Sequence, residues 1–260
     1  MSFTGKTKAS TYKDILQLDN SNTGVGTTLA VVKDGEGVSS SLLISDDQVS
    51  IRPQNDETTN TLDVRSQSGN QLLVVDSTNS LVKAGLTQTT VNTQIQHFSL
   101  SSGNLLPSGT NWTGIPSSGQ TTQTRIEMGS GSTPSTSFNV TLGGDDLVGH
   151  IFYVPVNITI DSCSVWAGAD ASSGDTIQFS VMSYDIDTSN SATGGDLSNG
   201  VENCVSPSTI TNAGYEQAYL QALTISTANV DAGKVIMAFI KSDGTNSDYS
   251  VNMNLVYHIR

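Results

Sequence analysis

Three histidines and 24 acidic side chains are the residues whose types could support catalysis or metal binding in this chain. His97, His150 and His258 stand far apart, and none belongs to a metal-binding spacing such as His-Glu-x-x-His. No serine occupies a Gly-x-Ser-x-Gly turn, and Gly24 and Gly26 lack the downstream lysine of a phosphate-binding loop. We therefore predict no catalytic residue, no metal site and no cofactor.

Paired carboxylates are what a glycosidase needs, and the chain offers several candidates. They are Asp145, Asp146, Asp161, Asp185, Asp187 and Glu216. The neighbouring acids Asp145 and Asp146, and the pair Asp185 and Asp187, also supply the hard oxygen ligands that calcium prefers, although neither set forms an EF-hand loop or a nonapeptide repeat. Because turns and strand ends of so acidic a chain carry many carboxylates, we interpret these residues as solvated turn acids.

The elements that would position such residues are predicted to be strands. Charged residues make up only 13% of the 260 residues, and Ser, Thr, Asn and Gly fill most polar positions, which favours strands and tight turns over helices. The formal net charge of -13 disfavours binding to nucleic acid. No apolar run approaches the roughly 20 residues of a membrane span, so we predict no membrane insertion.

The first residues show no basic region followed by an apolar stretch, so no secretory signal is visible and we expect synthesis in a cytosol. A reducing cytosol would keep Cys163 and Cys204 as thiols, and we interpret them as small buried side chains. A disulfide between them is the alternative.

Aromatic residues divide the chain, because Phe3 and Tyr12 are the only ones before Phe98. Residues 1–85 therefore form a module of short aliphatic strands separated by Gly, Asn and Asp turns, one of them at 76–79. Such strands bury little surface in one chain, so we predict a homotrimer whose copies share a thin core. An immunoglobulin-like sandwich with a small core is the alternative. The predicted trimer core consists of Val49, Ile51, Leu62, Val64, Leu72 and Val74.

Residues 86–124 are rich in Gly, Ser, Thr, Asn and Gln and read as a linker with an embedded strand near 94–100. Residues 125–260 show longer alternating strands, which predict a jelly-roll-like β-sandwich. Within it, the strand 236–240 is apolar on both faces and should be central, and the segment 187–207 should be an outer loop. We expect Trp166 in the core and Trp112 at a contact surface.

The N-terminal segment is the predicted docking end. Residues 1–85 hold 7 basic and 10 acidic side chains, whereas residues 86–260 hold 4 and 14. The acid-rich end should face water, because strong like charge opposes close docking. The docking candidates are Phe3, Lys6, Lys8, Tyr12 and Lys13.

Seven short segments stand out along the chain: 12–20 (YKDILQLDN), 33–37 (KDGEG), 42–45 (LLIS), 72–77 (LLVVDS), 165–168 (VWAG), 181–185 (VMSYD) and 212–216 (NAGYE). Together they resemble virion structural proteins of marine tailed phages. In that family a similar N-terminal module precedes varied C-terminal β domains, which implies a common stem with exchangeable heads.

This resemblance implies a non-enzymatic protein made in the host cytoplasm and carried on the virion surface. Its expected role is that of a trimeric capsid decoration protein or head fibre docked on the major capsid protein. The alternative is a short tail fibre or tail-tip adhesin, held by a tail adaptor protein and binding a host surface receptor or glycan. A polysaccharide-degrading tailspike is a third hypothesis, which the short chain and the lack of a catalytic motif disfavour.

Overall fold

The computed structural model describes residues 16–21, 23–100, 110–117, 126–140, 147–169, 173–214, 217–242 and 249–260. The chain divides into two compact units, Met1–Val91 and Asn92–Arg260, called here the N-terminal and the C-terminal unit. The described residues form twenty strands in antiparallel sheets, and none of their elements is a helix, so the protein is all-β as predicted. The described part of the chain accordingly holds no helix with the length and apolarity to cross a bilayer.

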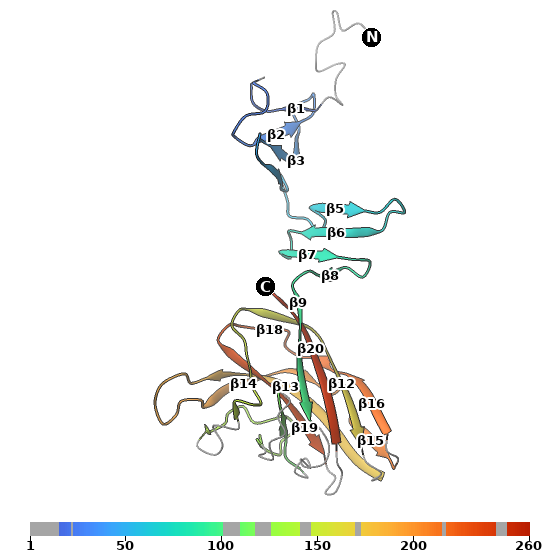
Figure 1. Ribbon diagram of the computed structural model, residues 1–260, viewed down its shortest axis with the longest axis vertical. Coiled ribbons are helices and arrows are strands. Elements are labelled where there is room, and N and C mark those ends of the chain that lie inside the picture. The colour runs from blue at the N-terminus through green and yellow to red at the C-terminus, as the bar shows by residue number, and fades with distance from the viewer. Residues whose placement is uncertain are drawn as a thin grey trace, which may run out of the picture. The chain divides into compact units, whose positions relative to one another are not determined.

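The N-terminal unit contains two four-stranded antiparallel sheets, each a meander of neighbouring strands (Figure 1). The first consists of β1 (Gln17–Leu18), β2 (Ala30–Lys33), β3 (Ser39–Ile44) and β4 (Val49–Ile51). The second consists of β5 (Leu62–Arg65), β6 (Gln71–Asp76), β7 (Leu81–Ala84) and β8 (Thr89–Thr90). The connecting turns use residues that tolerate a positive φ, such as Gly37 at 89° and Gly69 at 85°.

Asp76 closes the turn between β6 and β7. Its carboxylate is buried and accepts hydrogen bonds from the Asn79 backbone amide at 3.0 Å, the Asn79 side chain at 2.9 Å and the Lys83 ammonium at 3.1 Å. These bonds, chiefly the one from the Asn79 side chain, lower the pKa of Asp76 below its ordinary value of 3.8. The turn predicted at 76–79 is therefore held by an ionised aspartate.

Replacing Asp76 by Asn should destabilise the second sheet at pH 7 but not at strongly acidic pH. Since the folded-state pKa is lowered, this stabilisation is present above pH 3.8 and disappears as the pH falls through the folded-state value. Urea unfolding at pH 7 and at a series of pH values below 3.8 measures the difference between variant and parent, which should shrink as the pH falls, with exposed Asp47→Asn as the matched control. An equal loss of stability at every pH value would contradict this role.

The C-terminal unit is a β-sandwich of two antiparallel sheets (Figure 1). The smaller sheet has the order β16 (Gln217–Ala222), β12 (Ile158–Ala169), β20 (Tyr249–Ile259) and β9 (Thr93–Leu100), with β18 (Asn229–Val230) also paired to β12. The larger has the order β10 (Thr113–Ile115), β19 (Lys234–Ser242), β13 (Ser173–Ile186), β14 (Leu197–Val205) and β17 (Thr224–Ile225). In it β11 (Phe152–Tyr153) pairs with β19, and β15 (Ile210–Ala213) pairs with β13.

The core between these sheets is mainly aliphatic, with Phe98, Val165, Phe179 and Ile240 among its fully buried residues. A second apolar cluster lies on the other face of β19 and β13, where Phe239 and Tyr184 pack against residues of the segment 126–151. The strand β19 is thus buried on both faces and central, as the sequence predicted.

The sequence misplaced some segments of this unit. The strand β9, expected inside a linker, pairs over eight residues with β20 and supplies Phe98 to the core. The expected outer loop 187–207 contains β14, whose Leu197 and Cys204 are buried. Ser, Asn and Gly occupy many positions of β14, so its sequence shows no alternation of apolar and polar residues. Its pairing with β13 identifies it as a strand.

The two tryptophans exchange their expected places. Trp112 is only 1% exposed, and its Nε1 donates to the Gly131 carbonyl at 3.1 Å while the Lys241 ammonium lies 5.6 Å from the ring centroid. Trp166 is 51% exposed, because its neighbours Val165 and Ala167 are the residues of β12 that point into the core. Trp112 is therefore no surface contact, and Trp166 is no core residue.

Candidate functional site

One face of the second N-terminal sheet is apolar in two consecutive rows across β5, β6 and β7. The register aligns Leu62 with Val75 and Val82, and Val64 with Leu73 and Ala84. Residues opposite each other in a ladder share a face, so these side chains form one apolar face, called here the β5–β7 face. All six are exposed or half-buried in the single chain, with Val64 and Val82 each 42% exposed.

The first sheet repeats this arrangement. Ala30, Ile44 and Val49 stand in one row, and Leu42 and Ile51 stand in the next. These five residues form the β2–β4 face, and Val49 at its edge is 65% exposed. Among the described residues of the N-terminal unit, only Val32, Leu43 and Val74 are buried apolar side chains. Each sheet therefore presents an apolar surface that the described part of its own unit does not cover.

The residues predicted as trimer core do not all share these faces. Val49, Ile51, Leu62 and Val64 do, but Leu72 and Val74 point to the opposite side of β6. There Val74 is buried beside the polar row of Asp63 and Lys83. Successive side chains of a strand alternate, so Leu73 and Val75 take the positions that the sequence had assigned to Leu72 and Val74.

The predicted docking residues lie outside the described residues. They are Phe3, Lys6, Lys8, Tyr12 and Lys13. The acidic candidates Asp145, Asp146 and Glu216 also lie outside them.

The described acidic candidates are engaged in structural bonds. Asp185 binds Lys234 through one carboxylate oxygen and accepts from Asn199 through the other, at 2.8 Å. Asp187 accepts from the Ser189 amide and the Thr193 hydroxyl, both at 2.8 Å. These bonds lower the pKa of both carboxyls, in the case of Asp185 chiefly through Lys234. A glycosidase acid needs the opposite shift. Asp185 is a strand residue of β13 that pairs with Lys234 of β19, and Asp187 holds the turn that follows β13.

The histidines do not converge either. His97 is exposed on β9, His150 is buried, and Nδ1 of His258 lies 2.8 Å from a carboxylate oxygen of Asp161. Within the described ranges, no group of three or more His, Cys, Asp or Glu side chains is placed to hold a metal ion.

Cys163 on β12 and Cys204 on β14 are buried free thiols, as predicted. They meet in the core between the two sheets, where a hydrogen bond to Cys204 and burial raise the pKa of the Cys163 thiol far above its usual range. The Cys163 thiol is therefore a weak nucleophile in the folded protein.

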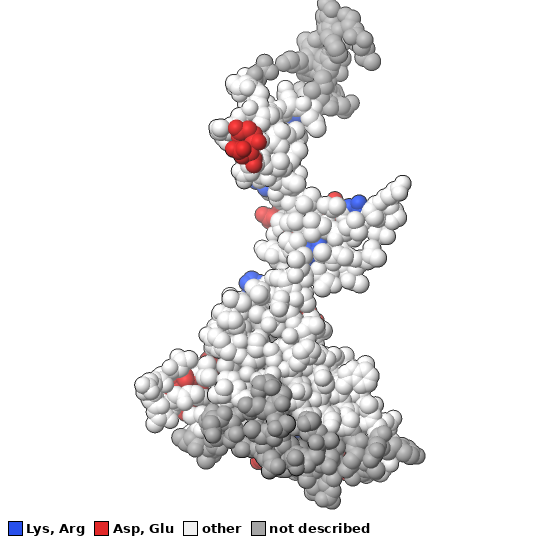
Figure 2. Space-filling view, viewed as in Figure 1, with Lys and Arg blue, Asp and Glu red and all other residues white. Residues whose placement is uncertain are grey.

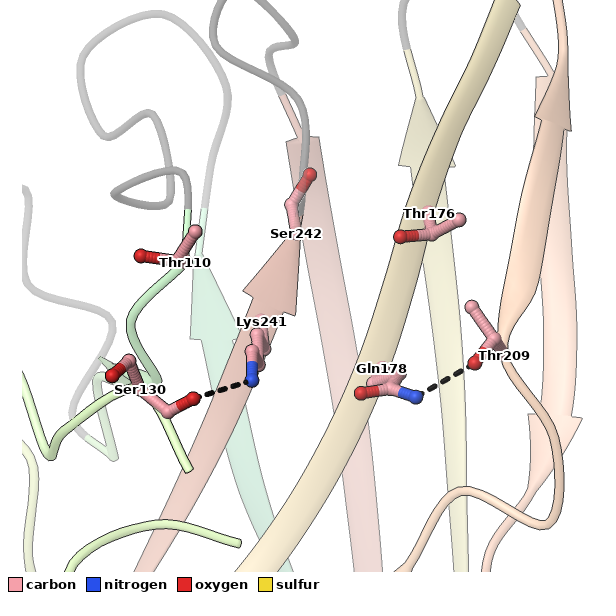
Figure 3. Close-up of a pocket in the computed structure, with 7 residues that line it drawn as sticks. All are labelled: Thr110, Ser130, Thr176, Gln178, Thr209, Lys241 and Ser242. Carbon is pink, nitrogen blue, oxygen red and sulfur yellow. Dashed lines mark hydrogen bonds between the residues drawn. The ribbon is translucent and has the colours of Figure 1, made fainter. Parts of the chain in front are cut away.

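A polar pocket of about 340 Å³ opens beside β13 and β19 (Figure 3). Its lining consists of Thr110, Ser130, Thr176, Gln178, Thr209, Lys241 and Ser242. Lys241 Nζ donates to the carbonyls of Ser130 at 3.0 Å and Gly131 at 2.8 Å, and Gln178 Nε2 donates to the Thr209 hydroxyl at 2.6 Å. These hydroxyl, amide and ammonium groups suit a small hydroxylated ligand. The pocket could not be predicted from the sequence, because its residues come from five separate segments.

Comparison with known proteins gives no functional assignment. No protein-family model matches the chain, and no curated protein matches it. Among solved structures, an aminopeptidase from the marine sediment archaeon Thaumarchaeota archaeon aligns with a TM-score of 0.33 and 7% sequence identity. The alignment covers 77% of this chain and 41% of that protein, so the chain spans less than half of that neighbour's length.

Proposed function

We propose that this protein is a non-enzymatic structural component of a phage particle, a homotrimer that decorates the capsid or forms a head fibre. The observation that carries the proposal is the pair of apolar faces in the N-terminal unit. Their strands are too short and too poor in buried side chains to offset the entropy of ordering the unit. Copies of the same chain, related by a threefold axis, would cover both faces with matching apolar surfaces.

The resemblance to virion proteins of marine tailed phages supports the assignment to a particle. An N-terminal unit whose apolar faces are covered only by other copies of the chain suits a component that is repeated on a particle. An acid-rich C-terminal unit suits a surface exposed to water. In this proposal residues 1–14 dock on the major capsid protein, and the C-terminal unit faces outward.

The native mass of the purified full-length protein tests the trimer. Light scattering coupled to gel filtration should give the mass of three 27.3 kDa chains, and this mass should persist on dilution. A stable monomer with intact strand content would refute the proposed assembly.

A tail fibre or tail-tip adhesin is the second candidate, and the polar pocket is what favours it. Hydroxyl and amide groups that surround a pocket of this size can orient one sugar residue. Titration of the full-length protein with host surface oligosaccharides separates the candidates. Saturable binding that Gln178→Ala abolishes would favour the adhesin, and no binding would favour the decoration protein.

A further inference from the structure

The smaller sheet of the C-terminal unit has an outer face that the described chain leaves uncovered. The strand registers place Trp166 between Leu220 and Asn252, and Asn254 between His97 and Ser164. Beyond the row of Thr93 and His258 at the bulge end, the outer face consists of Ile95, His97, Ser99, Ser162, Ser164, Trp166, Gly168, Ala218, Leu220, Ala222, Ser250, Asn252, Asn254 and Val256. It spans the strands β9, β20, β12 and β16, which lie side by side in Figure 1.

Large apolar side chains stand exposed on this outer face. Trp166 is 51%, Leu220 is 59% and Ile95 is 56% exposed, and Trp166 and Leu220 are direct neighbours across β12 and β16. Around them lie small residues such as Gly168, Ala218 and Ala222, and these let another surface approach closely. An exposed Trp beside an exposed Leu on a flat sheet is typical of a contact surface.

The outer face also carries no Asp, Glu, Lys or Arg, although the chain as a whole has a net charge of -13. In Figure 2 the described atoms over the upper part of these strands are mostly white, that is, neither Lys, Arg, Asp nor Glu. The acidic Asp161 stands at the β-bulge at one end of the face, where it is bonded to His258. Two copies of an acidic chain repel each other over most of their surface, and an uncharged apolar face removes that repulsion.

We propose that this outer face is a second self-association surface, which packs against the same faces of the other two copies around the threefold axis. The inference rests on the trimer proposed above and adds a contact between the C-terminal units. The self-contact buries Trp166 and Leu220 near the axis and lets the Asn and Ser side chains around them bond across copies. The acidic loops of the three copies remain in water.

Acrylamide quenching of Trp166 fluorescence in the full-length protein tests this contact. The difference between the parent and Trp166→Phe isolates the signal of Trp166 from that of buried Trp112. We expect a quenching constant at least threefold below that of free tryptophan amide. A trimer in which Trp166 is quenched like the free amide refutes the C-terminal contact and leaves the proposed trimer standing. A monomer refutes both.

Leu220→Asp provides the matching perturbation. This variant places one carboxylate from each copy near the threefold axis, which should separate the C-terminal units and raise the quenching of Trp166 at least threefold. The fold should stay intact, because Leu220 is exposed in the single chain. Val201→Asp adds the same charge at a 40% exposed position of β14 and should leave quenching unchanged. Equal effects of the two variants would contradict the proposal. A second result would also contradict it: Trp166 is quenched freely in the protein alone and is protected only when a neutral oligosaccharide is added. The outer face would then be a sugar-binding site.

Discussion

Replacing Leu73 by Asp should dissociate the trimer. Leu73 lies in the middle strand of the β5–β7 face, between Val64 and Ala84. Burying a carboxylate in an apolar contact costs at least about 3 kcal/mol per copy, so three copies lower the association constant by about a millionfold. Gel filtration with light scattering should then give the mass of a single 27.3 kDa chain.

Leu72→Asp is the matched control, because it changes the next residue of the same strand on the opposite side. Leu72 is already 43% exposed in the single chain, and the variant should remain trimeric. Dissociation by Leu72→Asp but not by Leu73→Asp would show that the opposite face is the contact. Retention of the trimer by both variants would contradict a core made from these sheets.

Deleting residues 1–14 should abolish incorporation into particles. The proposed docking end contains Phe3 and Tyr12, whose apolar contacts outweigh those of the three lysines, since an exposed ion pair contributes only about 0 to 1 kcal/mol. The copy number per purified particle, measured by quantitative mass spectrometry, should fall to background. Circular dichroism and native mass should stay unchanged, since the truncation spares the described strands.

A variant in which Lys6, Lys8 and Lys13 are replaced by Gln separates charge from apolar contact. We expect it to be incorporated with a modest loss that grows with ionic strength. Normal occupancy of the truncated protein would refute N-terminal docking and make the C-terminal unit the docking surface.

The all-β class and the central strand of the sandwich were predictable from the sequence. In β19, Ile236, Ala238 and Ile240 alternate with Val235, Met237 and Phe239, and burial on both faces follows from that pattern. The acid turn at 76–79 was equally visible, because Asp and Asn are strong turn formers.

The orientation of apolar runs was not predictable. The segment Leu72-Leu73-Val74-Val75 is apolar at every position, so it carries no period of two, and only its pairing with β5 and β7 reveals which residues share a face. For the same reason, the sequence did not show on which face of its strand Trp166 lies, and so did not show that it is exposed. Trp112 is buried in the cluster with Ile126 and Met128, and the sequence offers no means of pairing these residues with it.

Cryo-electron microscopy of intact particles tests the central claim most directly. The account predicts threefold-symmetric density for this protein on the particle exterior, with an antibody against the C-terminal unit labelling the outermost part. Purified infectious particles that lack both the density and the protein would contradict it.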